Sequence, residues 1–141
     1  MFLQLQMTTD YALRILVELA EQQRVVSSTE LSQRLDMPAK YVLQVGRKLK
    51  DYQFAHTVSG SKGGYILARA PEDITVYDVM EAFEGTTKIN RCLEHSEYCG
   101  RSATTSCAVH SLFCEVQHSL EIKLKSETLA TLLARNKRRT G

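Results

Sequence analysis

The stretch SSTELSQRLDMPAKYVLQVGRKLKDY, residues 27–52, decides the fold of this chain. Its first part predicts a short helix, because the capping candidates Ser28 and Thr29 precede leucines at helical spacing. The break DMP (36–38) ends that helix. Pro38 then suits the first turn of a second helix, because the N–H that proline lacks would have no partner there.

The second helix has two contrasting faces. Val42, Val45 and Leu49 recur at helical spacing and are expected in the core. The opposite face carries polar side chains, namely Lys40, Tyr41, Gln44, Arg47 and Lys48. A short helix, a tight turn and a second helix with polar residues near its start form the helix-turn-helix pattern, whose second helix enters the major groove of DNA. Ser28 and Lys40 are expected to add phosphate contacts.

A β-hairpin is predicted directly after these helices. Residues 54–58 and 65–67 have the composition of strands, and the glycine-rich SGSKGG (59–64) connects them. A hairpin in this place is typical of the wing of a winged helix, and its tip would bring Ser61 and Lys62 to DNA. An ordinary helical domain with one hairpin is the alternative, but order, spacing and charge together favour the winged helix.

Two further helices are predicted on either side of this unit. The sequence TTDYALRILVELAEQQ (8–23) has one apolar face, and Asp10 suits the positive end of its dipole. Another helix lies within residues 71–85, with Thr75 as its cap and Gly85 as its stop. Residues 1–85 are therefore expected to form a winged helix-turn-helix domain.

The four cysteines of the chain all fall in CLEHSEYCGRSATTSCAVHSLFC, residues 92–114. Residues 86–106 show no periodic pattern, and an irregular segment of this length in a small domain is usually functional or disordered. We interpret it as a sensor loop. Thiolates are soft ligands that suit an iron–sulfur cluster, which is the favoured interpretation.

Two other interpretations of the cysteines stay open. Two of the thiols could form a reversible disulfide, which would make the loop a switch without metal. Zinc could be bound with help from His95 or His110, although structural zinc sites usually pair ligands two to four residues apart, and this chain has no such cysteine pair.

Residues 107–141 are expected to hold a dimerisation helix and a tail. A helix over 107–125 would align one apolar stripe, made of Val109, Leu112, Phe113, Val116, Leu120 and Leu124. Such a stripe needs a surface to cover it, and we predict pairing with a second copy of the chain, with packing on its own domain as the alternative. A short helix over 126–134 and a frayed tail would follow.

Composition and charge narrow the class of protein. A chain of 141 residues with 43% hydrophobic residues can form one domain with an appended helix. Net charge is only +2, but residues 34–69 hold seven Lys/Arg against two Asp, a local surplus that suits phosphates. No apolar run approaches the ~20 residues that span a bilayer. The N-terminus lacks the features of a signal peptide. We expect a cytoplasmic protein without membrane contact.

An enzyme is the alternative class of function. A reactive cysteine could act as a nucleophile or in redox chemistry. The chain has no nucleophile-elbow motif, no phosphate-cradling loop and no CxxC motif, so we expect no enzymatic activity.

The chain resembles the Rrf-two family of bacterial transcription regulators over almost its whole length. The motifs that carry this resemblance are TDYALRIL (9–16), KYVLQVGRKL (40–49), GSKGGYILARAPEDIT (60–75), FEG (83–85) and TLATLL (128–133). The resemblance implies a mainly α fold with a small β-hairpin wing, that is, a winged helix-turn-helix followed by a long C-terminal dimerisation helix. It also implies a homodimer that binds a palindromic operator in double-stranded DNA, and we expect it to act as a repressor.

The resemblance further implies a cofactor. In sensing members of the family, three loop cysteines hold an iron–sulfur cluster of the 2Fe–2S or 4Fe–4S type, and by order they match Cys92, Cys99 and Cys107. An acidic residue of the other subunit completes the ligands in some relatives, and Asp10 occupies that position, with His95 and His110 as alternatives. Operator affinity would then respond to nitric oxide, iron or redox state.

Overall fold

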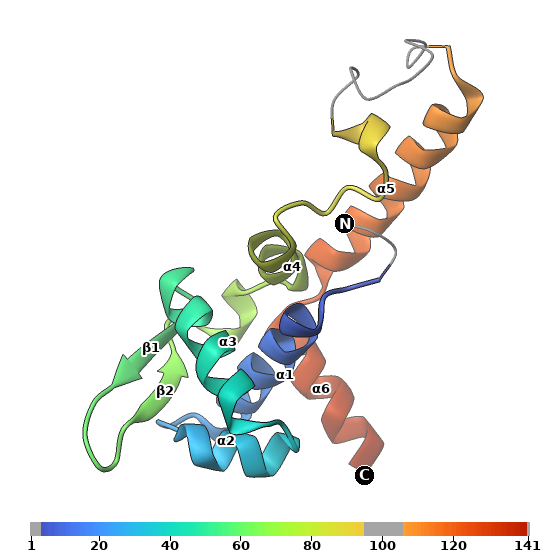
Figure 1. Ribbon diagram of the computed structural model, residues 1–141. Helices are drawn as coiled ribbons and strands as arrows, with labels where there is room; N and C mark the ends of the chain where they lie inside the picture. The colour runs from blue at the N-terminus through green and yellow to red at the C-terminus, as the bar shows by residue number, and fades with distance from the viewer. Residues whose placement is uncertain (1–3, 95–105, 141) are drawn as a thin grey trace.

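The computed structural model describes residues 4–94 and 106–140. The elements in chain order are α1 (Met7–Gln22), α2 (Ser28–Leu35), α3 (Ala39–Asp51), β1 (Ala55–Val58), β2 (Gly64–Leu67), the 3-10 turn η1 (Pro71–Asp73), α4 (Val76–Glu84), the 3-10 turn η2 (Arg91–Leu93), α5 (Ala108–Ser126) and α6 (Leu129–Thr140). The predicted fold, a mainly helical winged helix-turn-helix with a long C-terminal helix, is confirmed. Figure 1 shows α5 projecting away from the body that the other helices and the hairpin form.

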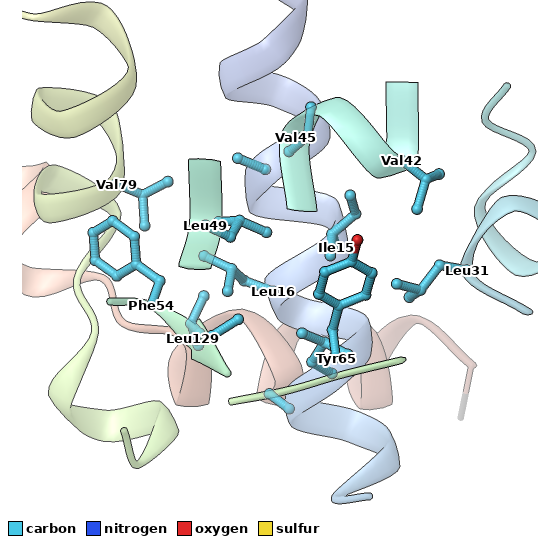
Figure 2. Packing of buried hydrophobic residues seen from close by; sticks show 14 of the residues in the cluster. Ile15, Leu16, Leu31, Val42, Val45, Leu49, Phe54, Tyr65, Val79 and Leu129 are labelled. Atoms are coloured by element: carbon cyan, nitrogen blue, oxygen red, sulfur yellow. The ribbon is translucent and has the colours of Figure 1, made fainter. Parts of the chain in front are cut away.

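The core is built around α1. Ile15, Leu16 and Leu19 of this helix are at most 1% exposed, and burial of each such side chain contributes about 1.5–3 kcal/mol. Figure 2 shows side chains of α2, α3, α4, α6 and the hairpin converging on the same cluster. The apolar faces predicted for α1 and α3 are the faces that the structure buries, and α4 buries Val76, Val79, Met80 and Phe83.

The wing, residues 55–67, is anchored at its base. Its strands pair antiparallel in the register Ala55↔Leu67 to Val58↔Gly64. Val26, in the connection between α1 and α2, forms an isolated antiparallel β-bridge with Tyr65, because its N–H donates to the Tyr65 carbonyl at 2.8 Å and its carbonyl accepts from the Tyr65 N–H at 2.9 Å. The hairpin is thus tied to the segment that leads into the helix-turn-helix.

Tyr65 also packs on α3. A Cβ atom added at Gly46 would lie 2.5 Å from Cζ of the Tyr65 ring, so the ring occupies the space that a side chain at this helical position would need. Gly46 and Tyr65 are both buried. The wing and α3 therefore meet by a close approach that only glycine permits.

The cap of one helix differs from the prediction, and the cap of another agrees with it. The side chain of Ser27, not Ser28 or Thr29, caps α2 by accepting from the Glu30 N–H at 3.1 Å. For α4 the predicted cap is confirmed, and Thr75 forms a reciprocal capping box with Asp78.

The expectation of a short last helix and a frayed tail is wrong, because α6 continues to Thr140. Leu129 is fully buried at its start, and Leu132 and Leu133 pack against the core. The residues that follow are mostly arginine and lysine, which have good helix propensity and suit the C-terminal end of the dipole. None of the helices within residues 4–94 and 106–140 is both long enough and apolar enough to cross a membrane.

The contact between Gly46 and Tyr65 can be tested by Gly46→Ala. Alanine ordinarily stabilises a helix by about 1 kcal/mol relative to glycine. Here we expect the opposite sign, a loss of about 1–3 kcal/mol in the free energy of unfolding from overpacking, measured by urea denaturation. In a Tyr65→Leu background the same change should be much better tolerated. A stabilised Gly46→Ala protein would contradict this packing.

Candidate functional site

The outer face of α3 is positioned by the apolar residues on its inner face. Val42, Val45 and Leu49 are fully buried, which fixes the rotation of the helix about its axis. The predicted polar residues consequently face outward: Lys40, Tyr41, Gln44 and Arg47 are exposed and Lys48 is half-buried. Tyr41 is steadied by Tyr11 of α1, with ring centroids 6.0 Å apart.

The tip of the wing carries the other predicted residues. Ser61 and Lys62 are exposed in a turn that the Gly63 N–H closes on the Gly60 carbonyl at 3.0 Å. The backbone of Gly60 has φ 107°, a conformation that favours glycine. Ser28 is the half-buried first residue of α2. Helix α3 and the wing tip thus project from one anchored unit.

Two arginines of the basic surplus in residues 34–69 have partners within the protein, Arg34 through ion pairs and Arg69 through an aromatic ring. Arg34 contacts Glu30 at 2.8 Å and Glu18 at 3.4 Å. Hydrogen bonds from Arg24 and Arg34 lower the pKa of Glu30 to about 2, so this acid is ionised at neutral pH. Arg69 lies over the Phe54 ring, 4.8 Å from its centroid. The other five basic residues of 34–69 form no ion pair within the part of the chain that the structure describes; they are Lys40, Arg47, Lys48, Lys50 and Lys62.

Sequence reasoning missed Leu43. Its side chain is 52% exposed on the outer side of α3, one residue from Gln44. An apolar side chain on a recognition helix can contact the thymine methyl group in the major groove. The available signal was its position, because Leu43 falls outside the spacing of Val42, Val45 and Leu49.

The cysteines gather near the outer end of α5. Cys92 lies in η2, which packs on α5, and the Asn90 side-chain amide donates to its sulfur at 3.2 Å. Cys107 is the residue before α5 begins. Cys114 is exposed one turn further than His110, with 3.4 Å between its Sγ and the histidine Nε2. Cys99 and His95 lie outside the described residues.

The described residues supply part of a ligand set for a metal cluster at this end. Among residues 4–94 and 106–140, no three His, Cys, Asp or Glu side chains are grouped to hold a metal ion. Cys92 and Cys107 are half-buried free thiols, one in the turn that packs on α5 and the other directly before α5, and thiolates are the donors that iron–sulfur clusters use. Asp10 lies in the first turn of α1 and accepts from Arg14 at 3.0 Å, so a role as ligand requires that this ion pair opens.

A second residue that sequence reasoning missed is Gln117. It is 5% exposed in the middle of α5. Its Oε1 accepts from the Ile89 N–H at 2.9 Å, and its amide donates to the Thr87 carbonyl at 3.0 Å. An ion pair of 2.8 Å between Lys88 and Glu121 adds to this attachment. Residues 87–89, which lead into the segment that holds Cys92, Cys99 and Cys107 (residues 92–107, the cysteine segment), are thereby fixed to α5.

The predicted apolar stripe of α5 divides into two parts. Phe113, Leu120 and Leu124 are half-buried. The other three, Val109, Leu112 and Val116, are 58%, 54% and 45% exposed. Their spacing of three and four residues puts them on one side of the helix. This exposed stripe (Val109, Leu112, Val116) has no cover within the described part of the chain.

The short helix, tight turn and exposed second helix, followed by an anchored wing, define a winged helix-turn-helix DNA-binding protein. Residues 5–135 match the model of the Rrf2 family, described as "Iron-dependent Transcriptional regulator", and the chain belongs to this family of transcriptional regulators, as its sequence motifs predicted.

Two similar proteins agree with this assignment, and a third shares the fold. A putative HTH-type transcriptional regulator of Aquifex aeolicus is 29% identical over 127 residues, which are 89% of this chain and 88% of that protein. The structure of IscR from T. potens has a TM-score of 0.78 and 26% identity, covering 99% of this chain and 92% of that one. The structure of CymR (YrzC), the global cysteine regulator of B. subtilis, has a TM-score of 0.79 and 23% identity, covering 95% and 98%, and shows the shared fold.

The attachment made by Gln117 can be tested by Gln117→Ala. This change leaves the Ile89 N–H and the Thr87 carbonyl without their partner, so we expect a loss of about 1–3 kcal/mol in the free energy of unfolding. Amide hydrogen exchange should rise at residues 87–89 and remain unchanged in α3. Replacement of the exposed neighbour His118 by alanine is the matched control and should leave both measurements near wild type. Equal effects of the two changes would contradict the attachment.

Proposed function

We propose that this protein is a transcription regulator, acting as a repressor in the cytoplasm, that binds an operator through α3 and the wing. The observation that carries the proposal is the single exposed surface formed by the outer face of α3 and the wing tip. Lys40, Arg47, Lys48 and Lys62 form no ion pair among the described residues, and they lie around residues able to read bases. The major groove admits an α-helix, and its phosphate borders attract positive charge.

The residues have different roles in this proposal. Gln44 and Arg47 face outward in the middle of α3, where they can hydrogen-bond to base edges, and Leu43 beside them can contact a thymine methyl group. The remaining residues, Tyr41, Lys48, Ser61, Lys62, Lys40 and Ser28, hold the protein on the backbone or at the edge of the groove. Base contacts give discrimination, whereas phosphate contacts set affinity and its salt dependence.

The regulator acts as a homodimer that pairs through α5. A palindromic operator needs two copies of α3 related by a two-fold axis. The exposed stripe (Val109, Leu112, Val116) is the apolar surface that a second α5 would cover. It lies on the projecting helix, away from α3 and the wing, so pairing there leaves the DNA-binding surface free.

Cys92, Cys99 and Cys107 bind an iron–sulfur cluster, with Asp10 of the partner subunit as the fourth ligand in this proposal. Cys92 and Cys107 supply thiolates at one end of α5, and the family model is that of iron-dependent regulators. The cluster would supply a redox- and nitric-oxide-sensitive group that holds the cysteine segment in one arrangement. A metal-free thiol/disulfide switch is the second candidate, supported by the exposed Cys114 beside His110.

The DNA surface is tested by two alanine variants that should differ in kind. Gln44→Ala should reduce the preference for operator over random DNA by about 1–3 kcal/mol, because a base contact is lost. Lys62→Ala should weaken binding to both DNAs alike, because a phosphate contact carries no sequence information. Fluorescence anisotropy with both duplexes measures these effects. Wild-type behaviour of both variants would place the reading surface elsewhere.

The dimer is tested by Leu112→Asp combined with Val116→Asp. Both side chains are about half exposed in one protomer, so the variant should fold, but pairing would bury two unpaired charges that each cost several kcal/mol. Light scattering should show a monomer with wild-type circular dichroism. Ile122→Asp is the matched control, because Ile122 is 56% exposed on another side of α5, and it should remain a dimer. A dimeric double variant would refute this interface.

The cofactor is tested by the absorption spectrum of protein purified without oxygen. The wild type and Cys114→Ala should show the visible bands of an iron–sulfur cluster, and Cys99→Ala should not. Asp10→Ala should keep part of the colour, because a carboxylate is a weaker ligand for iron than three thiolates. A colourless wild type that forms a disulfide on oxidation, detected by mass spectrometry, would replace the cluster with the thiol switch.

A further inference from the structure

The second half of α6 carries a one-sided set of arginines. Arg135, Arg138 and Arg139 follow the i, i+3, i+4 spacing that places side chains on the same face of a helix. We call this set the arginine face. All three residues are exposed, and Lys137 lies on the opposite side of the same turn. No acidic residue occurs from Thr128 to the end of the sequence, so α6 contributes no negative charge of its own.

The arginine face lies beside the helix-turn-helix. A cavity of about 340 Å³ between α1, α2 and α6 is lined by Val17 of α1, Leu35 of α2, and Arg135 and Arg139 of α6, among others. Leu35 is the last residue of α2, and α3 begins only four residues later. Figure 1 shows the end of α6 at the same end of the molecule as α2, on the side of α2 and α3 away from the wing.

The ion pairs around this cavity leave an excess of positive charge. Arg14 pairs with Asp10, Glu18 with Arg34, and Arg135 with Glu127. Within residues 4–94 and 106–140, Arg138 and Arg139 take part in no ion pair. The dipole of α6 favours basic residues in its last turn, but it does not account for their position next to the turn of the DNA-binding motif.

We propose that Arg138 and Arg139 bind backbone phosphates of DNA on the flank of the major groove that lies away from the wing. The inference rests on the proposed function, because it requires α3 in the groove, and it adds α6 as a second anchor. Guanidinium groups suit phosphate oxygens, with which they form paired hydrogen bonds. The contact is independent of sequence, so it should raise affinity for every duplex without changing the preferred operator.

The salt dependence of binding tests this proposal. Each lost phosphate contact should reduce the slope of log K against log salt by about 0.9. With a random-sequence duplex as probe, Arg138→Gln combined with Arg139→Gln should therefore lower the slope by about 1.8 per protomer. The ratio of affinities for operator and random DNA should stay as in the wild type. The charge-retaining pair Arg138→Lys and Arg139→Lys should keep the wild-type slope, which separates charge from helix structure.

Two control variants test whether the effect is specific to Arg138 and Arg139. Arg91→Gln removes one exposed arginine at the other end of the molecule, in η2, and should leave the slope unchanged. Lys137→Gln removes a charge from the opposite side of α6 and should also leave it unchanged. A wild-type slope in the double glutamine variant, or an equal fall with Lys137→Gln, would overturn the role of the arginine face while leaving α3 as the reader. If the wild type binds no DNA, the proposed function fails as well.

Discussion

The relation between the wing and the recognition helix depends on the close approach of Tyr65 to Gly46. The tyrosine ring fills the place of a side chain on α3, while its backbone pairs with Val26 through two hydrogen bonds of 2.8 and 2.9 Å. One residue of β2 therefore contacts both the entry to α2 and the middle of α3. This contact holds the recognition helix and the wing together before any DNA is bound. Because the two DNA-contacting elements are already positioned, less entropy is lost on binding.

Most of the winged helix could be predicted from the sequence, because its buried residues recur at helical spacing. Val42, Val45 and Leu49 predict which side of α3 faces the core, and Pro38 predicts where that helix starts. The glycine-rich sequence of residues 59–64 predicts the turn of the hairpin. These signals are local, so they do not depend on which distant segments meet.

The features that were not predicted depend on contacts between segments that are distant in the sequence. Gln117 looks like a surface residue in an amphipathic pattern, and its burial becomes evident only when the backbone of residues 87–89 lies against α5. The last turns of α6 lack apolar residues, and the helix persists because Leu129 is anchored in the core at its start. Leu43 was overlooked because an exposed leucine gives no periodic signal. The ligand set of the cysteine segment depends on Cys99, which lies outside the described residues, and on a second subunit.

Helix α5 links the cysteine segment to the DNA-binding body in our account. Gln117 fixes residues 87–89 to its middle, and Cys107 precedes its start. At its other end the Glu127 carbonyl accepts from the Val76 N–H at 2.8 Å, and the Leu129 N–H donates to the Ile74 carbonyl at 3.0 Å. A change in the cysteine segment thus has a continuous, hydrogen-bonded element through which to act, provided that α5 has two arrangements of different DNA affinity.

The most direct test of this account is the operator affinity of cluster-loaded and cluster-free protein, compared without oxygen on a duplex selected from random DNA. We predict a difference within the 5- to 150-fold range that is typical of coupled sites. The same difference should shrink in Gln117→Ala, whose cysteine segment is less firmly attached to α5. Equal affinities of loaded and cluster-free wild-type protein, with both dimeric and folded, would contradict control of DNA binding by the cysteine segment.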